Sequence, residues 1–215
     1  MQAHDEKDKI LIIDFGSQVT KLIARRIRDL GVYSEIIPPS SLKKIKEYKN
    51  IKGIIFSGGP STVTKYKYQS VSRNIFQKKI PILGICYGLQ LIAKLFGGKI
   101  KQSKKKREFG RALIFKKRKS LLTKDFFNSK KTVWMSHEDA VVKIPENFKT
   151  VASTKDSKLT IIENTKKKIY GVQFHPEITH TDNGKKIFKN FLFDIFKVKK
   201  KWNIVTQKNI LINEI

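Results

Sequence analysis

Short apolar runs alternate with segments of helical spacing along the first part of the chain. The first run, residues 9–16 (KILIIDFG), is rich in β-branched residues and ends in glycine, which is typical of a buried strand that enters a loop. Apolar side chains then recur at helical spacing over residues 18–30, and Gly31 follows as a stop signal. Another apolar run, residues 33–37, ends at two prolines. This alternation predicts a parallel sheet covered by helices on both faces.

The same alternation continues to residue 96. We expect a polar helix near 41–48, a strand over 53–57, a helix near 65–77, a strand over 80–85 and a helix over 87–96. Ligands of such sheets bind at the carboxyl ends of the parallel strands. The segments that directly follow the strands are therefore the first places to look for chemistry.

After Gly98 the expected strands become shorter and are separated by polar segments. They cover residues 111–116, 132–135, 139–144, 150–153, 159–163 and 168–174. We expect them to form a partly antiparallel extension of the same sheet, followed by a last helix over about 184–196. The predicted fold class is therefore α/β, with an open, mostly parallel twisted sheet, helices on both faces and a small antiparallel β extension.

The chain is long enough for one globular domain. Its 215 residues, of which 40% are hydrophobic, can bury a single core. We expect a disordered N-terminus over residues 1–8, a domain over 9–197 and a tail over 198–215. The tail is amphipathic, with apolar side chains from Trp202 to Ile212, and predicts contact with a missing or separately encoded partner domain.

Cysteine use and the N-terminal residues indicate a cellular compartment. One cysteine cannot form an internal disulfide, so a reducing cytosol is expected. The first ten residues mix both signs of charge and lack the apolar core of a signal peptide. The uncharged stretch over residues 80–93 has 14 residues, too few to cross a bilayer. We therefore predict a soluble cytoplasmic protein with no membrane partner.

The net charge of +28 would suit a protein that binds nucleic acid. However, 39 of the 46 basic residues are lysines, whereas arginine, which makes bidentate contacts with phosphate or guanine, is scarce. Compositional drift toward lysine is the simpler explanation, and we predict no nucleic-acid partner. The basic runs at 104–107 and 197–201 could still favour an acidic partner or a phosphate-bearing ligand.

The single cysteine, Cys86, lies between Gly84 and Gly88, where a predicted strand passes into a predicted helix. This arrangement is that of a nucleophile elbow, in which small residues allow a sharp turn and the approach of substrate. The N-terminus of the helix would favour negative charge on the sulfur and supply an oxyanion-binding N–H at Tyr87. A lone cysteine is more commonly a small buried apolar side chain, so the elbow alone leaves both interpretations open.

A cysteine nucleophile needs a base, and the chain has four histidines. His4 lies in the N-terminus that we expect to be disordered. His137 and His180 have no carboxylate at an obvious fixed offset, although acidic residues adjoin His137. The remaining histidine, His175, is therefore the preferred candidate.

His175 stands in the segment GVQFHPEITH. Because Pro176 biases the residue before it toward an extended conformation, Glu177 can project from the same side as the imidazole. A carboxylate there would orient the ring, which is the role of the third member of a catalytic triad. Taken alone, this segment would suit an ordinary turn at a strand end. Beside an elbow, it predicts a Cys-His-Glu triad of Cys86, His175 and Glu177.

A glycine pair follows another predicted strand, in FSGGPST (56–62). Its backbone N–H groups could face a ligand and supply a second oxyanion donor beside the elbow. The chain has neither a GxxxxGK[ST] phosphate loop nor the Asp and Ser of an SGGxDS pyrophosphate loop. We therefore expect no ATP site in this chain.

The elbow, the glycine pair and the HPE segment, in this order, resemble the class I (triad) glutamine amidotransferases, which have a flavodoxin-like fold. The resemblance covers about residues 9–197. Within this family, five segments are similar to the glutaminase domains of GMP synthases: DFGSQ (14–18), GICYGLQ (84–90), REFGRA (107–112), VWMSHED (133–139) and GVQFHPEITHT (171–181).

The resemblance implies the role of each triad residue. Cys86 would attack the side-chain carboxamide of glutamine, and His175 would pass a proton to the departing ammonia. Glu177 would orient His175, and the N–H groups of Gly59 and Tyr87 would form the oxyanion hole. Water would then hydrolyse the thioester to glutamate.

The resemblance also implies substrate contacts and a partner. Gly58, Gln90, Ser136 and His137 would lie near the glutamine substrate. The ammonia would aminate adenylylated XMP in a separate ATP pyrophosphatase domain, which would hold the ATP and magnesium, whereas this chain would need no cofactor or metal. We expect the isolated chain to be a weak glutaminase that the synthetase half activates.

Two alternatives remain open. The same site could belong to another amidotransferase or to a γ-glutamyl peptidase, although the segments DFGSQ and WMSH argue against both. The chain could also be a non-catalytic basic binding module, although an intact triad with both oxyanion elements argues against that function.

Overall fold

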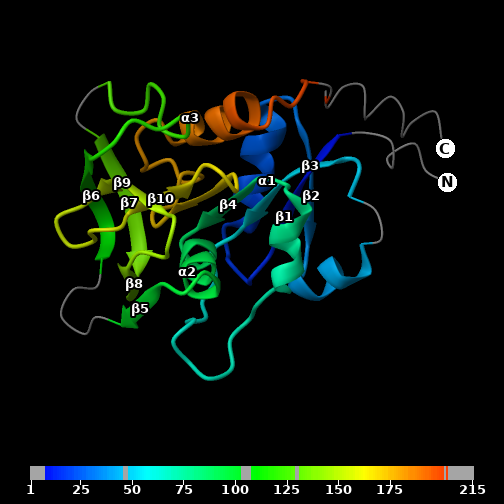
Figure 1. Cartoon of the computed structure of the whole chain (residues 1–215). Coiled ribbons are helices and arrows are strands. Elements are labelled where there is room, and N and C mark those ends of the chain that lie inside the picture. Colours follow the sequence, from blue (N-terminus) through cyan, green and yellow to red (C-terminus); the bar gives the residue numbers. More distant parts are fainter. Residues whose placement is uncertain (1–7, 46–47, 103–107, 129–130, 201, 203–215) are drawn as a thin grey trace.

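A nine-stranded mixed sheet forms the centre of the structure, a computed structural model that describes residues 8–45, 48–102, 108–128, 131–200 and 202 (Figure 1). Its strands, in spatial order, are β2 (Tyr33–Ile37), β1 (Lys9–Ile13), β3 (Ile51–Phe56), β4 (Ile82–Ile85), β11 (Ile169–Val172), β10 (Ile161–Asn164), β9 (Lys149–Ser153), β6 (Glu108–Lys116) and β7 (Lys131–His137). From β2 to β11 all neighbours are parallel, and from β11 to β7 all are antiparallel. The predicted parallel sheet with an antiparallel extension is therefore confirmed.

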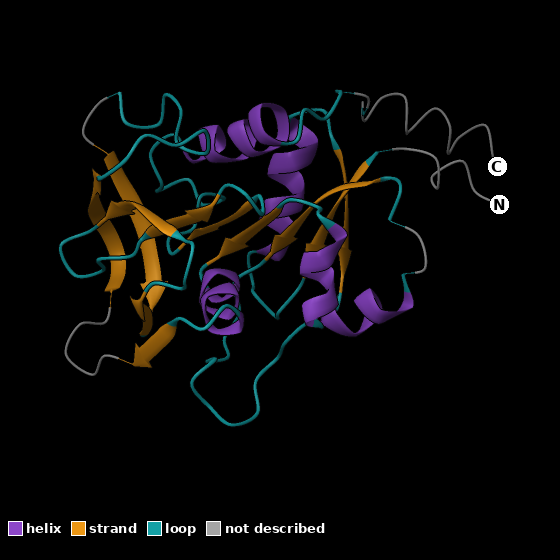
Figure 2. Ribbon diagram, in the orientation of Figure 1, coloured by secondary structure: helices purple, strands orange, loops and turns teal. Residues whose placement is uncertain are grey.

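Helices cover both faces of the parallel part of the sheet (Figure 2). One face carries α1 (Thr20–Asp29) and α3 (Gly184–Lys189), which continues into a π-helical turn at Asn190–Ile195. The other face carries α2 (Tyr87–Leu95). The described chain contains no helix that is long and apolar enough to cross a membrane.

Alternation along β1 shows how the two faces are filled. Ile10 and Ile12 belong to the core on the α1 and α3 side, whereas Leu11 and Ile13 belong to the core on the α2 side. All four side chains are at most 1% exposed. Because side chains of a strand point alternately to opposite faces, a continuous apolar run is what a strand covered on both sides requires.

Two of the predicted helices are wrong in extent. The helix expected near 41–48 is a 3₁₀ segment, η1 (Pro39–Lys44), and the helix expected near 65–77 is only a 3₁₀ segment, η2 (Arg73–Lys78). Residues 46–47 lie outside the described part of the chain. The stretch from Lys65 to Ser72 has no apolar stripe at helical spacing, and Tyr66 at its centre is 97% exposed, so nothing packs it as a helix.

A small second sheet is an addition to the predicted fold. Strand β5 (Lys99–Gln102) pairs antiparallel with β8 (Asp139–Lys143), so the strand expected at 139–144 does not extend the main sheet. The sequence of β5 is KIKQ, which has a single apolar residue and carries almost no strand signal. The predicted helix over 184–196 is present, but its second half is a π-helical turn.

The beginning of the expected tail is part of the packed structure. Val198 is 7% exposed and belongs to the core on the α1 side. The backbone N–H of Trp202 donates to the carbonyl oxygen of Gly31 over 3.1 Å. Residues 1–7 and 203–215, which hold most of the expected disordered N-terminus and of the tail, lie outside the described residues.

Candidate active site

The elbow at Cys86 connects β4 to α2. Cys86 has φ 52° and ψ −106°, a conformation that is strained for a residue with a side chain. Close packing explains both flanking glycines. A Cβ on Gly88 would lie 2.4 Å from the carbonyl oxygen of Phe56, and a Cβ on Gly84 would lie 2.5 Å from the carbonyl carbon of Gly88. The predicted strand–elbow–helix is therefore present, and the glycines allow the helix to approach the neighbouring strand.

Backbone hydrogen bonds fix the elbow to the strands on either side. The N–H of Cys86 donates to the carbonyl of Val172, the last residue of β11, over 2.8 Å. The N–H of Gly88 donates to the carbonyl of Ser57, which directly follows β3, over 3.1 Å. The nucleophile candidate is thus held between two parallel neighbours of its own strand.

His175 lies three residues beyond the end of β11, and its imidazole is 8% exposed. Its Nδ1 is 2.8 Å from Oε1 of Glu177, whose side chain is fully buried. Backbone bonds hold the segment in place, because the His175 N–H donates to the Trp134 carbonyl over 3.0 Å and the Thr181 hydroxyl donates to the His175 carbonyl over 2.7 Å. The HPE segment therefore forms the expected His–carboxylate pair.

The imidazole of His175 also lies close enough to Cys86 for the two side chains to interact. Since Nδ1 faces Glu177, Nε2 is the ring nitrogen left for the sulfur. Burial lowers the pKa of His175, but the hydrogen bonds and negative charges of Cys86 and Glu177 outweigh burial and raise this pKa to about 10. The three side chains form a continuous sulfur–imidazole–carboxylate array.

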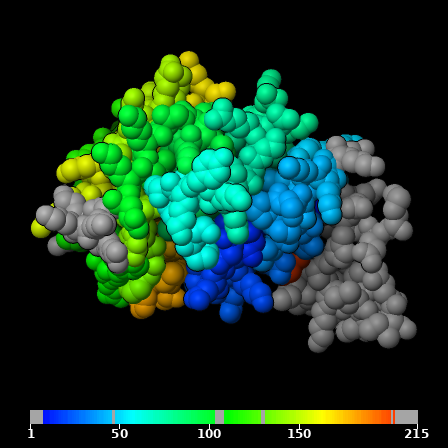
Figure 3. All heavy atoms as spheres, turned by 90° about the horizontal axis from the view of Figure 1, so that it is seen from below, coloured from blue at the N-terminus to red at the C-terminus, as the bar shows by residue number. Residues whose placement is uncertain are grey.

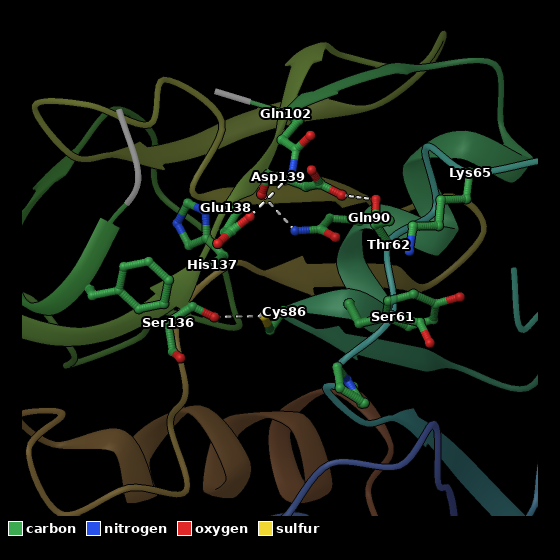
Figure 4. A pocket seen from close by; sticks show the side chains of 14 residues that line it. Ser61, Thr62, Lys65, Cys86, Gln90, Gln102, Ser136, His137, Glu138 and Asp139 are labelled. Atoms are coloured by element: carbon green, nitrogen blue, oxygen red, sulfur yellow. Dashed lines mark hydrogen bonds between the residues drawn. The ribbon is translucent and has the colours of Figure 1, made fainter. Parts of the chain in front are cut away.

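The sulfur of Cys86 lies where two cavities meet. Cys86, Gly59, Pro60 and Ser136 line both of them. The larger, of about 400 Å³, is otherwise lined by Gln102, Phe109 and residues of the segments 61–65, 87–90 and 137–139 (Figure 4). The smaller, of about 310 Å³, is otherwise lined by residues 16–19, Trp134, His175 and Ile178. In Figure 3, which shows the molecule from below, the cyan residues that follow β3 lie in the middle, between the dark blue residues near the N-terminus and the green residues from the middle of the chain.

The glycine pair after β3 packs against the triad. A Cβ on Gly58 would lie 3.1 Å from Cε1 of His175, and a Cβ on Gly59 would lie 2.6 Å from the carbonyl oxygen of Phe15. Because Gly59 and Cys86 line the same two cavities, the backbone of the pair is beside the sulfur. The structure therefore brings the glycine pair and the elbow together, as expected from the position of each directly after a predicted strand.

The other expected substrate residues differ in their surroundings. Ser136 has an exposed side chain, but its backbone carbonyl oxygen is 3.6 Å from the Cys86 sulfur (Figure 4). His137 is buried and places Nε2 3.1 Å from Oε2 of Glu108, while its Nδ1 has no partner among the described residues. Gln90 is not a solvent-facing helix residue, because it is 3% exposed and directs its amide into the site.

Asp139 and Gln173 lie at the site but are not among the site residues predicted from the sequence. Asp139 is 5% exposed and lines the larger cavity; its Oδ2 accepts from the Thr62 hydroxyl, and its Oδ1 has no partner in the described part of the chain. Gln173 is fully buried, and its amide nitrogen is 3.8 Å from the Cys86 sulfur. Both belong to segments that resemble family motifs, but spacing along the chain gives no sign of these contacts.

Within the residues that the structure describes, no group of three or more His, Cys, Asp and Glu side chains is arranged to hold a metal ion. The polar groups that line the two cavities at the sulfur are amides, hydroxyls, carboxylates, imidazoles and the ammonium group of Lys65. Such groups can hold an amino acid and move protons.

The sequence of the chain is similar to those of a known protein family. The family model described as "Glutamine amidotransferase class-I" matches residues 11–195. The chain is 50% identical over 198 residues to a glutamine-hydrolysing GMP synthase of Brachyspira hyodysenteriae, covering 92% of this chain and 38% of that protein. It is 47% identical over 211 residues to the enzyme of the same name from Clostridium tetani, covering 98% of this chain and 41% of that protein. The chain thus spans about two fifths of the length of these curated relatives.

Solved structures give the same picture of the fold. A Thermoplasma acidophilum protein, described as one of the subunits of a GMP synthase, superimposes with a TM-score of 0.74 and 27% identity, covering 96% of this chain and 98% of that one. A glutamine amidotransferase of Thermotoga maritima superimposes with a TM-score of 0.66 and 20% identity, covering 94% of this chain and 85% of that one.

Proposed function

Because the chain belongs to the class-I glutamine amidotransferase family, we propose that it is the glutamine-hydrolysing half of a GMP synthase. The observation that carries this proposal is the array of Cys86, His175 and Glu177 at a strained elbow beside two cavities. A buried thiol in contact with an imidazole that is held by a carboxylate is equipped for acyl transfer.

The first step forms a thioester. The sulfur of Cys86, having given its proton to His175, attacks the amide carbon of the glutamine side chain, and the carbonyl oxygen becomes an oxyanion. The N–H groups of Gly59 and Tyr87, which both line the larger cavity with Cys86, are the proposed donors to that oxyanion. The tetrahedral intermediate then collapses as the C–N bond breaks, and the imidazolium of His175 gives its proton to the leaving nitrogen, so that ammonia departs.

The second step hydrolyses the thioester. His175, now neutral, takes a proton from a water molecule that attacks the thioester carbon. The C–S bond breaks, the proton returns to the sulfur, and glutamate leaves. Glu177 keeps the proton-bearing Nδ1 of the ring directed toward itself in both steps, so that Nε2 always faces the reacting atoms.

The larger cavity suits the amino-acid end of glutamine. Asp139 lines this cavity, its buried Oδ1 has no partner among the described residues, and a buried carboxylate calls for a positively charged partner. The α-ammonium group of glutamine would supply that charge. Gln90 and Ser136 line the same cavity and complete its polar wall.

The smaller cavity suits the departure of ammonia. His175 lines only this one of the two cavities, and the leaving nitrogen receives its proton from His175. Ammonia would therefore leave the sulfur on the side of Ser17, Trp134 and Ile178. A second unit that consumes ammonia would need to cover this side of the molecule.

The relatives support a proposal for the identity of that second unit. The two GMP synthases are each about two and a half times as long as this chain, which leaves room for a further domain. We propose that this domain is an ATP pyrophosphatase, fused or separately encoded, that binds ATP and magnesium. It would adenylylate XMP with release of pyrophosphate, and ammonia would then displace AMP to form GMP. The complete reaction would then belong to cytoplasmic purine synthesis.

The test is glutamate release from glutamine by the purified chain and by its Cys86→Ala variant, with and without a synthetase half, ATP and XMP. Release that requires Cys86, and that rises when the nucleotide-loaded partner is added, supports the proposal. Release that requires Cys86 but never produces GMP would favour another amidotransferase. No release under any condition would favour a non-catalytic binding module.

A further inference from the structure

A buried amide side chain contacts the sulfur of the candidate nucleophile. Gln173 follows β11 directly and is fully buried. Its Nε2 is 3.8 Å from the Cys86 sulfur, and its backbone N–H donates to the Thr160 carbonyl over 2.8 Å. Its Oε1 is 3.5 Å from Nε2 of Gln90, which also donates to the Asp139 carbonyl over 2.7 Å. The two amides therefore connect the wall of the larger cavity to the sulfur.

The orientation of both amides follows from their fixed partner. The group of Gln90 that faces the Asp139 carbonyl must be the NH₂, because a carbonyl oxygen only accepts. The same NH₂ faces Gln173, which therefore presents its oxygen to Gln90 and its own NH₂ to the sulfur. The amide of Gln173 must therefore donate, and not accept, the hydrogen bond to the Cys86 sulfur.

The sulfur also has an acceptor within hydrogen-bond reach. The carbonyl oxygen of Ser136 is 3.6 Å away and can accept a hydrogen bond from the thiol, but it opposes negative charge on a thiolate (Figure 4). Hydrogen bonds donated to the sulfur by His175 and Gln173 instead stabilise a thiolate. His175 must give up its proton during each catalytic cycle, whereas the Gln173 amide remains a donor throughout.

We propose that Gln173 is a positioning residue that donates its amide N–H to the Cys86 sulfur, stabilises the thiolate against the Ser136 carbonyl and holds the sulfur beside the glutamine cavity. The contribution to catalysis rests on the proposed glutaminase function. The effect on the sulfur itself does not, because it follows from the contacts alone.

The test of this effect is the rate of alkylation of Cys86 by iodoacetamide as a function of pH. Since Cys86 is the chain's only cysteine, the modified fraction reports on one site. The Gln173→Met variant removes the donor while keeping the length of the side chain. We expect the midpoint of its rate profile to move up by about one pH unit, because a hydrogen bond to a charged group is lost. The nearly isosteric Gln173→Glu variant, which replaces the NH₂ by an oxygen, should move the midpoint further.

Asn190→Leu is the matched control. Asn190 is a buried amide, 3% exposed, whose NH₂ donates to the carbonyls of Leu122 and Lys124 and has no described contact with the site. This variant should lose stability as Gln173→Met does, but its alkylation profile should coincide with that of the unmodified chain. If the Gln173→Met variant does not fold, Gln173→Glu carries the test. Profiles of folded Gln173 variants that coincide with the unmodified chain would overturn the proposal.

Steady-state kinetics separate positioning from pocket shape. For Gln173→Met we expect kcat for glutamine to fall about tenfold, with KM changed less than twofold, because one hydrogen bond to the reacting sulfur is lost. A raised KM with unchanged kcat and an unchanged alkylation profile would overturn the proposal, since Gln173 would then only shape the cavity. If the unmodified chain does not hydrolyse glutamine, the proposed function fails, but the alkylation result still decides the contact with the sulfur.

Discussion

Replacing Glu177 by Gln removes one charge from the array and leaves its shape nearly unchanged. The Glu177 side chain is fully buried, its Oε1 is 2.8 Å from Nδ1 of His175, and its Oε2 has no partner in the described part of the chain. In the variant, either the oxygen or the NH₂ of the amide can face Nδ1. The oxygen preserves the tautomer but not the charge, and the NH₂ forces the ring into the wrong tautomer.

The size of the effect can be worked from this contact. An opposite charge at hydrogen-bond distance raises the pKa of an imidazole by about 1–3 units, and each unit corresponds to about 1.4 kcal/mol. Loss of the charge therefore removes about 1.4–4 kcal/mol of stabilisation from the imidazolium of His175, or roughly 10- to 1,000-fold in rate. The wrong tautomer adds to this loss, and the corresponding change in a serine-protease triad costs about 10⁴-fold. We expect kcat for glutamine to fall by about 10²- to 10⁴-fold, with KM nearly unchanged.

The assay is glutamate release at saturating glutamine for the unmodified chain, Glu177→Gln and a control, Glu163→Gln. Glu163 is also a buried carboxylate, 4% exposed, but it accepts from the Ser120 hydroxyl and has no described contact with the triad. The kcat of the control should stay within about threefold of that of the unmodified chain, because a substitution distant from the site leaves the site unchanged. A Glu177→Gln variant that is folded and equally active as the control would refute the role of the carboxylate, and with it the argument from charge.

Three further predictions concern the elbow, the imidazole and the cavity. Gly88→Ala should lower the free energy of unfolding by about 2–4 kcal/mol in urea titrations, since its Cβ would lie 2.4 Å from a backbone oxygen of Phe56; an unchanged midpoint would contradict the packing argument. Because the folded pKa of His175 is raised to about 10 from 6.5, its charge contributes stability fully below pH 6.5, and this contribution is lost as the pH rises through 10. The difference in unfolding free energy between the unmodified chain and His175→Gln should therefore shrink over that interval, and a constant difference would argue against it. Asp139→Asn should raise KM for glutamine about 10- to 100-fold, and glutaramate, which lacks the α-amino group, should show no such difference between the two proteins.

The triad could be predicted from the sequence because each part of it is local. Gly84, Cys86 and Gly88 are close along the chain, and so are His175 and Glu177, so spacing and residue type carry the signal. The structure adds the contact between the two parts, which depends on the pairing of β4 with β11. Strand pairing over such a separation cannot be read from one sequence.

The site residues that the sequence analysis missed make contacts with residues far away along the chain. The contact of Gln173 with Cys86 joins residues that are 87 apart, and that of Thr62 with Asp139 joins residues that are 77 apart. Neither Gln173 nor Asp139 belongs to a periodic or local sequence pattern that would indicate its contact. The helix predicted near 65–77 is wrong in extent for a local reason, because the stretch from Lys65 to Ser72 has no apolar stripe at helical spacing and Tyr66 is almost fully exposed.

The geometry of the whole site follows from three adjacent parallel strands. β3, β4 and β11 are neighbours in the sheet, and they are followed by the glycine pair, the elbow and the HPE segment, respectively. In the register of β4 and β11, Ile85 pairs with Val172, the last residue of β11. Cys86 therefore lies beside the end of β11, and its N–H donates to the Val172 carbonyl. Adjacent strands are about 4.8 Å apart, so each chemical group lies one strand spacing from the next. A shift of one residue between β4 and β11 would turn the following side chains to the other face and separate the sulfur from the imidazole. Pairing of these strands therefore sets the distances on which the proposed chemistry depends, whereas β7 of the antiparallel extension contributes Ser136 to the cavity wall and β8 of the small second sheet contributes Asp139.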